Sequence, residues 1–472
     1  MNTWLSLLPP VITIAIAIWS KRIVPALLMG LLAGSYLLHP TLTGGFEGAV
    51  DEIVATLTDK GNLQVLLFLY LFSGLIGIVK RSGGITAFSA KAGQLIKSEK
   101  GVLLTMWALI PVTFIDCGFR IVGAGSITLP LAEKYRVSRE RLAFMLNNTA
   151  SPVVELIPIA TTFVGFNVAI VAQGMKAAGI AGSTSAYAIW LRAIPLEFFS
   201  IVVLLITFAS VFIQFKRPPQ TSKAAHAGTS GDKMRMNMQD AKPMIEPRVA
   251  NLIVPMVSVI VLSVFFFWFF GSAKAKGISI LAAIADSEPN RAMLVALVIT
   301  LAITAVCYFA QKYSLRQQTE DVISGGNDIM TTLVILSIAW PLAAVSQDLG
   351  LNELIKLQLG NSLPPWSVPV SLFLLSSAVT YFTGSGWGAA SLIMPFAIPL
   401  AASVGSGIPL CVAAVITGGT FGDVTSPVAG MTNMSSNIAR ADHGKYMAYA
   451  GPLNFSAAAI AALLFVLAGV FQ

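Results

Sequence analysis

Hydrophobic residues fill most of this chain in runs that are each long enough to cross a lipid bilayer as a helix. Polar and charged residues are mostly confined to the segments between these runs. The pattern predicts an all-α polytopic membrane protein with about ten transmembrane helices. The predicted spans are 4–20, 23–38, 62–79, 142–168, 186–214, 249–270, 291–311, 328–346, 408–439 and 446–471.

Two further apolar stretches, 101–132 and 367–400, do not fit this scheme, because each is too short for two full helices and a turn. Each has a glycine-rich centre, Cys117-Gly118 in the first and Gly384-Ser385-Gly386 in the second. We therefore expect two re-entrant hairpins, each made of two half-helices. Non-helical backbone at membrane depth is tolerated only where protein buries it or where it lines a cavity, so both tips are candidate functional sites.

The positions of the basic residues support this topology. With the N-terminus outside and both hairpins returning to the side they leave, 22 of the 30 Lys and Arg residues fall in inner loops. If 101–132 crossed the membrane once, the basic loop 134–141 would fall outside instead. The basic residues behind the net charge of +8 are thus expected to orient the chain in a bacterial cytoplasmic (inner) membrane. No basic block or zinc-finger spacing indicates a nucleic-acid partner, and the expected partner is membrane lipid.

Composition agrees with this assignment. Charged residues make up 11% of the chain, less than half of the roughly 25% that is typical of soluble domains. The three cysteines are scattered through apolar segments and predict no disulfide framework. The stretch from Met1 to Ser20 has no basic start and no small-residue cleavage site, so we interpret it as a first transmembrane helix.

The two halves of the chain resemble each other weakly. Gly61-Asn62 recurs as Gly326-Asn327 after 265 positions, and Ser151-Pro152 recurs as Ser426-Pro427 after 275. Each half would hold five spans and one hairpin, an odd number of crossings, so the second half is expected to be inverted. Inverted repeats with interrupted helices are typical of secondary transporters. The predicted parts are a first repeat (1–214), a basic cytoplasmic linker (215–248) and a second repeat (249–472).

Few charged residues lie at membrane depth, where a buried charge costs about 2.5–3.5 kcal/mol and is a functional hypothesis by default. They are Asp116, Arg120, Glu155, Glu197 and Asp423, with Asp328 at the entrance of a span. Asp116 and Arg120 are four residues apart, which fits either a self-neutralising helical pair or a substrate site. Glu197 follows Pro195 near the outer side, and for it we favour a structural role.

The two longest spans each contain a polar, proline-containing interruption. The first is Asn147-Asn148-Thr149-Ala150-Ser151-Pro152, and the second is Gly422-Asp423-Val424-Thr425-Ser426-Pro427. Proline frees a backbone carbonyl one turn earlier, and carbonyls with hydroxyls and a carboxylate make a hard-oxygen site suited to Na⁺. We predict that Asp423, Thr425 and Ser426 bind Na⁺, with the first interruption as the symmetry-related shell. The structural alternative is a proline kink satisfied by Ser and Thr hydroxyls.

An intramembrane enzyme is not favoured. A nucleophilic Ser385 would need a base within hydrogen-bond reach, but His39, His226 and His443 all fall in predicted loops. The intramembrane aspartates sit in no motif typical of an aspartyl protease. No cofactor is expected apart from Na⁺ and H⁺ as coupling ions.

Several of these segments resemble the sodium/proton antiporters of the NhaC type. The resemblance covers most of both halves, and it implies the ion-transporter superfamily with inverted repeats, paired hairpins, a homodimer and elevator motion. The matching residues are Phe114-Ile115-Asp116 with Phe119, Leu129-Pro130-Leu131, Lys134-Tyr135, Val137 to Ala143, Thr149 to Val153, Thr383-Gly384-Ser385 with Trp387-Gly388, Met394-Pro395, Ile398-Pro399, Phe421-Gly422-Asp423 and Ser426-Pro427.

The chain also departs from this family's pattern. The family's Asp-Asp-Tyr-Phe-Asn tip is here the segment 116–120, Asn147 replaces an acid, and Ala429-Gly430-Met431 stands where Ser-Asp-Thr is typical. Three carboxylates are lost and one arginine is gained. Two functions stay open. In Na⁺/H⁺ antiport, which the extent of the resemblance slightly favours, Asp116 or Glu155 would carry the proton. In a Na⁺-coupled carrier of a small organic anion or amino acid, Arg120 would bind the solute's carboxylate.

Overall fold

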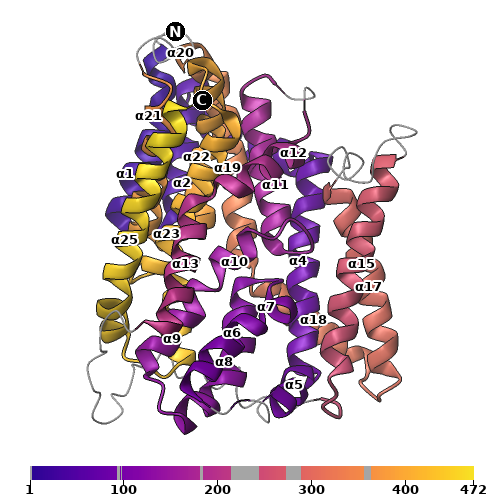
Figure 1. The fold of residues 1–472 in the computed structure, drawn as a ribbon. Coiled ribbons are helices and arrows are strands. Elements are labelled where there is room, and N and C mark those ends of the chain that lie inside the picture. The colour runs from indigo at the N-terminus through magenta and orange to yellow at the C-terminus, as the bar shows by residue number, and fades with distance from the viewer. Residues whose placement is uncertain are drawn as a thin grey trace.

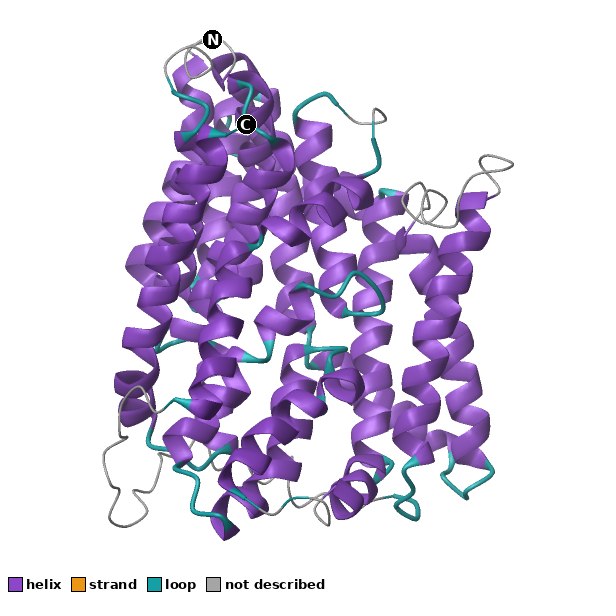
Figure 2. Ribbon diagram, in the orientation of Figure 1, coloured by secondary structure: helices purple, strands orange, loops and turns teal. Residues whose placement is uncertain are grey.

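The computed structural model describes residues 3–92, 96, 98–180, 184–213, 244–272, 289–355 and 363–471. Within these residues the chain is helical with connecting turns, and no strand element occurs (Figure 2). Among the described residues, seven helices are long and apolar enough to cross a membrane, and one bent pair makes an eighth, so the number of about ten spans stays a prediction. The chain is therefore an all-helical multi-pass membrane protein, as predicted. Most of the expected linker 215–248 lies outside the described residues.

The helices follow one another as shown in Figure 1. Their bounds are η1 (Thr3–Leu7), α1 (Leu8–Ser20), α2 (Ile23–Leu38), α3 (Gly44–Thr58), α4 (Lys60–Arg81), α5 (Gly84–Ala92), α6 (Glu99–Ala108), α7 (Ile110–Thr113), α8 (Cys117–Lys134), α9 (Arg139–Asn148), α10 (Ser151–Glu155), α11 (Thr162–Ala177), α12 (Ala186–Ala193), η2 (Ile194–Leu196), α13 (Phe198–Phe212), α15 (Ala250–Ser272), α17 (Pro289–Phe309), α18 (Leu315–Asn327), α19 (Met330–Asp348), α20 (Leu351–Leu354), α21 (Ser367–Thr383), α22 (Gly386–Val404), α23 (Ile408–Thr425), α24 (Gly430–Ile438) and α25 (His443–Val470).

Three predicted spans are interrupted in the structure. The span predicted at 408–439 is divided into α23 and α24 by non-helical backbone at 426–429. The span predicted at 142–168 consists of α9, α10 and the first part of α11, with non-helical backbone between them. The span predicted at 186–214 is bent by 42° where η2 meets α13. Pro195 lies in η2 and cannot donate a backbone hydrogen bond, which accounts for a break at this place.

The two predicted hairpin segments also contain a break. In the first, non-helical backbone at Phe114–Asp116 separates α7 from α8. In the second, Gly384 ends α21 with a φ of +72°, and a Cβ there would lie 2.8 Å from the Val428 carbonyl oxygen. Only glycine tolerates both conditions. Helix α22 alone has 19 residues and is long enough to cross a membrane. It is therefore longer than the half-helix that the sequence predicts for this part of the second segment.

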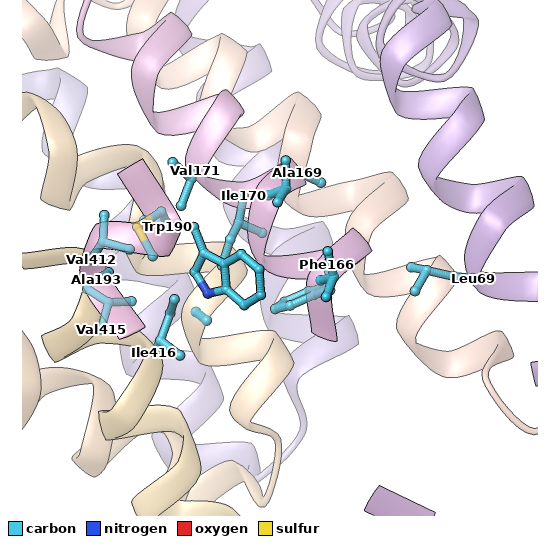
Figure 3. Packing of buried hydrophobic residues seen from close by; sticks show 14 of the residues in the cluster. Leu69, Phe166, Ala169, Ile170, Val171, Trp190, Ala193, Val412, Val415 and Ile416 are labelled. Carbon is cyan, nitrogen blue, oxygen red and sulfur yellow. The ribbon is translucent and has the colours of Figure 1, made fainter. Parts of the chain in front are cut away.

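Helix α23 is buried along almost its whole length and packs against α12, α13, α21, α22 and α25, and we call it the central helix. Its glycines permit this close packing, because a Cβ at Gly418 would lie 2.7 Å from the Phe373 carbonyl oxygen. Figure 3 shows how apolar side chains fill the surrounding space: the buried Trp190 ring lies between Ile170 on α11 and Ile416 on α23. Dense packing around α23 holds its polar C-terminal end inside the protein.

Candidate functional site

Asp423 lies in the last turn of α23 and is only 8% exposed. Its Oδ1 accepts a hydrogen bond of 3.1 Å from the backbone N–H of Gly386, at the start of α22. A Cβ on Gly386 would lie 2.9 Å from the Asp423 Oδ2, so the carboxylate reaches this backbone only because residue 386 is glycine. The N-terminal end of α22, with its partial positive charge, therefore faces a buried carboxylate.

Glu155 ends α10 and is 1% exposed. Its Oε2 accepts a hydrogen bond of 3.0 Å from the Ser200 hydroxyl on α13 and another from the Thr420 hydroxyl on α23. Thr420 and Asp423 are three residues apart and share one face of α23. Two carboxyl groups from distant parts of the chain are thus brought to one side of the central helix.

A cavity with about 10 Å³ of free space for a water-sized sphere lies between these groups, enough for about one water molecule. Glu155, Asp423, Thr420 and Asn167 supply its polar lining. No basic side chain is present among the described residues that line it. The Nδ2 of Asn167 is buried and has no hydrogen-bond partner in the described part of the chain. The cavity can therefore hold a small ion beside carboxylate and amide groups.

An aromatic wall closes one side of this cavity. The ring of Trp387, in the first turn of α22, stacks on Phe166 with centroids 4.3 Å apart. The same ring meets Phe163 edge to face at 5.2 Å. All three residues line the cavity. Such apolar walls exclude water and so strengthen the electrostatic interactions inside a site.

Arg120 is fully buried but does not line the cavity. Its Nη2 donates to the Met106 carbonyl oxygen at 2.8 Å and to the Thr149 hydroxyl at 2.9 Å. Its Nη1 donates to the Thr113 hydroxyl at 2.7 Å, and its Nε donates to the Thr149 carbonyl oxygen. The guanidinium therefore ties α6 and α7 to the break between α9 and α10, through neutral acceptors only.

The helical ion pair that the spacing of Asp116 and Arg120 allows is not formed. Asp116 is instead the N-cap of α8, where it accepts a 2.9 Å hydrogen bond from the Phe119 N–H. Its other oxygen accepts a 3.2 Å hydrogen bond from the Thr162 hydroxyl. Asp328 is 64% exposed and lies 3.6 Å from the Lys80 ammonium, away from the buried carboxylates.

Asn147 and Asn148 hold the end of α23 in place. The Asn147 amide donates to the Val424 carbonyl oxygen at 3.1 Å and to the Tyr446 hydroxyl at 2.7 Å. The Asn148 amide donates to the Asn454 Oδ1 at 2.8 Å, and the Asn454 amide donates to the Val424 carbonyl oxygen at 2.9 Å. Both side chains therefore satisfy backbone and side-chain groups near the break after α23.

The hydroxyl groups of the two interruptions and of Ser385 differ in whether they already form hydrogen bonds. Ser426 donates to the Tyr381 carbonyl oxygen at 2.6 Å, and Ser385 caps α22 by accepting a 3.1 Å hydrogen bond from Gly388. The hydroxyls of Ser151 and Thr425 are buried and have no hydrogen bond of good geometry to any described residue. The Ser151 hydroxyl nevertheless lies within reach of the Asp423 carboxylate. Of the predicted Na⁺ ligands, only Asp423 lines the cavity.

Three polar residues near the cavity were missed or discounted by the sequence interpretation. Asn167 and Thr420 line it; Asn167 is flanked by apolar residues in α11, and Thr420 lies one turn before Asp423 in α23. Glu197 was assigned a structural role, yet it is fully buried beside Glu155, close enough for the two charges to repel. An acid at membrane depth was a signal in the sequence, whereas its proximity to Glu155 depends on the tertiary structure.

Known proteins are similar to this chain in sequence or in fold. A family model described as the Na⁺/H⁺ antiporter family matches residues 156–470. An uncharacterised protein of Haemophilus influenzae is 25% identical over 453 residues, which is 94% of this chain and 86% of that protein.

Two solved structures have a similar fold. MtrF of Neisseria gonorrhoeae, described as illuminating a class of antimetabolite efflux pumps, has a TM-score of 0.59 at 14% identity, covering 90% of this chain and 84% of MtrF. The YdaH transporter of Alcanivorax borkumensis, described as having an unusual topology, has a TM-score of 0.59 at 15% identity, covering 90% of this chain and 88% of YdaH.

Proposed function

This chain belongs to the Na⁺/H⁺ antiporter family, and on that premise we propose that it exchanges Na⁺ for H⁺ across a bacterial cytoplasmic membrane. The chain is a multi-pass secondary transporter and not an enzyme. The observation that carries the proposal is the pair of carboxyl groups, Glu155 and Asp423, lining one cavity in which none of the described lining residues is basic.

The electrostatics of this pair favour exchange of two cations. Two carboxylates buried together without a positive partner are costly, because burial removes their hydration and their charges repel. A bound Na⁺ relieves this cost, and so does a bound proton. Because Na⁺ beside one carboxyl group and a proton on the other both reduce the negative charge of the same cavity, binding of either ion weakens binding of the other. This is the condition for antiport when the cavity opens alternately to the two sides.

Within this proposal the residues divide between the two ions. Asp423 is the carboxylate ligand of Na⁺, and Asn167, which lines the same cavity, offers its amide oxygen as a further ligand. Thr425 and Ser426, the other predicted ligands, would have to reach the ion from the end of α23. Glu155, held by Ser200 and Thr420, carries the proton. Asp116 is less suited to that role because it caps α8.

The architecture in this proposal keeps the predicted repeats and hairpins. Breaks at 114–116 and 384–385, and at 149–150 and 426–429, follow the same order in the two halves of the chain. This order supports two inverted repeats, 1–214 and 249–472, each with one re-entrant hairpin. A homodimer and the absence of any organic cofactor belong to the same proposal.

The competing function is a Na⁺-coupled carrier of a small organic anion or amino acid. It requires a guanidinium that can reach a solute carboxylate. Arg120 is buried and already donates to Met106, Thr113 and Thr149. The cavity between the carboxyl groups has room for about one water molecule, which suits an ion better than an organic solute. Both observations favour the exchange of ions.

Purified protein in liposomes that contain a pH-sensitive dye tests this function. Na⁺ added outside should make the lumen alkaline in the wild type, and Asp423→Asn should abolish the change. The matched control is Asp51→Asn, because Asp51 is an exposed acid on α3. Proton movement at the wild-type rate in Asp423→Asn would remove Asp423 from the site. A wild type that moves no protons but takes up labelled amino acids or small carboxylates with Na⁺ would establish the competing function.

A further inference from the structure

Glu197 lies at the bend between η2 and α13, where the two helical segments meet at 42°. It occupies the N-cap position of α13, but its side chain makes no capping hydrogen bond. The residue is 0% exposed, and neither carboxylate oxygen has a hydrogen-bond partner among the described residues. A buried carboxyl group without partners is costly, so a structural role in capping or pairing does not explain it.

The position of Glu197 relative to Glu155 follows from α13. Ser200 is one turn after Glu197 and lies on the same face of the helix. The Ser200 hydroxyl donates to the Glu155 Oε2 at 3.0 Å, so Glu155 meets α13 at this face. The two carboxyl groups therefore lie within the range over which their charges repel.

The charged groups that act on Glu197 and Glu155 are acidic. Glu155 faces Glu197 from α10, and Asp423 of α23 acts on Glu155 in turn. On α12, Arg192 points to the surface. On α9, Arg141 contacts the other end of α13 through the Ser210 carbonyl oxygen, and it pairs with Glu99. The part of the chain that the structure describes therefore places no positive partner beside Glu197.

We propose that Glu197 is a proton-carrying residue that exchanges a proton with Glu155, one step removed from the Na⁺ cavity. Glu197 does not line that cavity, so it is not a ligand of the transported cation. When Na⁺ enters, one O–H bond breaks at Glu155 and one forms at the ionised Glu197. Glu197 then releases this proton to water, and the reverse sequence returns it. This inference rests on the proposed Na⁺/H⁺ exchange.

The test separates the proton step from the sodium step. Glu197→Gln keeps the shape of the side chain but cannot carry a proton. In proteoliposomes, Na⁺-driven proton flux should fall by about tenfold or more. Exchange of labelled Na⁺ for unlabelled Na⁺, which needs no proton, should stay near the wild-type rate. Glu197→Asp should restore proton flux with an altered pH profile.

The matched control is Glu140→Gln. Glu140 is also a buried glutamate, 1% exposed, whose two oxygens lack partners in the described chain, and it lies on α9 away from the cavity lining. Both fluxes should be unchanged in this variant. A Glu197→Gln variant with the wild-type proton flux and pH profile would overturn the inference, as would an equal loss of both fluxes in folded protein.

A second measurement uses the wild type, in case Glu197→Gln does not fold. A hydrophobic carbodiimide reacts with protonated carboxyl groups in apolar surroundings, and mass spectrometry locates the adduct. Without Na⁺ one proton exchanges between Glu155 and Glu197, so Glu197 is protonated part of the time. Because Na⁺ drives release of this proton to water, added Na⁺ should lower labelling of Glu197 at fixed pH. An absence of labelling, or labelling that ignores Na⁺, would overturn the inference. A wild type without Na⁺-driven proton flux would instead refute the proposed function itself.

Discussion

The backbone N–H of Gly386 donates a 3.1 Å hydrogen bond to the Asp423 carboxylate, which joins the first turn of α22 to the last turn of α23. These residues are far apart in the sequence, and their contact closes one side of the cavity that Glu155 also lines. Any change in this contact moves the carboxylate that we propose as the Na⁺ ligand.

Replacing Gly386 with alanine should therefore impair transport. The added Cβ would lie 2.9 Å from the Asp423 Oδ2 and 3.0 Å from the Gly419 carbonyl oxygen, so the carboxylate must shift. We expect the Na⁺ concentration for half-maximal proton flux to rise by about tenfold, which corresponds to about 1.4 kcal/mol. Gly430→Ala is the control, because nothing lies within 4 Å of its added Cβ. Unchanged Na⁺ dependence in Gly386→Ala would contradict this geometry.

Asn167 should determine part of the Na⁺ affinity. Its amide lines the cavity, and its buried Nδ2 has no partner among the described residues. Asn167→Leu has a similar volume but offers no oxygen, so we expect weaker Na⁺ binding by about 1–3 kcal/mol. Isothermal titration of purified protein with Na⁺ measures this directly. Wild-type affinity in the variant would show that the amide does not contact the ion.

Arg120 should matter for stability more than for solute recognition. Arg120→Ala leaves buried acceptors on Met106, Thr113 and Thr149 without their donor. Each unsatisfied group costs about 1–3 kcal/mol, and Arg120→Lys should not recover the loss because an ammonium lacks the planar fork. Thermal unfolding in detergent gives the comparison. A variant of wild-type stability that has lost only organic-solute transport would favour the carrier hypothesis instead.

Sodium/proton antiporters of the NhaC type have an acid at the position of Asn147. Replacing Asn147 with aspartate should not increase the stability or the proton flux of this protein. The Asn147 amide donates to the Val424 carbonyl oxygen at 3.1 Å, and an ionised carboxylate at the same place would repel that oxygen. Asn147→Asp should destabilise the folded state by about 1–3 kcal/mol. Thermal stability and proton flux of the variant should both fall. An active, fully stable Asn147→Asp would mean that the carboxylate finds a cation at this site.

Gly422→Ala should push α23 away from α21. Its Cβ would lie 2.2 Å from the Thr380 Cγ2, and packed helices tolerate such additions only by moving apart. Overpacking of this kind costs about 1–3 kcal/mol. Gly451→Ala, whose Cβ meets nothing within 4 Å, is the matched control in thermal unfolding. Equal stability of the two variants would contradict the close packing of α21 and α23.

The sequence was sufficient for the class of the protein and for some of the places where helices break, but it predicted 186–214 as one span and did not show the bend within it. Long apolar runs dictate membrane helices because backbone polar groups in lipid must be satisfied within the helix, and this prediction is confirmed. The resemblance to sodium/proton antiporters is confirmed as well, since the family match covers residues 156–470. Proline and glycine act locally, and they mark the break at Gly384 and the bend that contains Pro195.

Only the tertiary structure decided which polar groups remain available for function. Asn147 and Arg120 are candidate ligands by their sequence positions, but both side chains already donate hydrogen bonds to groups of other helices. Glu197 looked structural, yet folding buries it near Glu155, and its carboxylate has no hydrogen-bond partner among the described residues. Hydrogen bonding between distant segments depends on how helices pack, and no local pattern encodes it. The sequence by itself determined the membrane-embedded helical fold, whereas packing around α23 decided that Glu155 and Asp423 share one cavity.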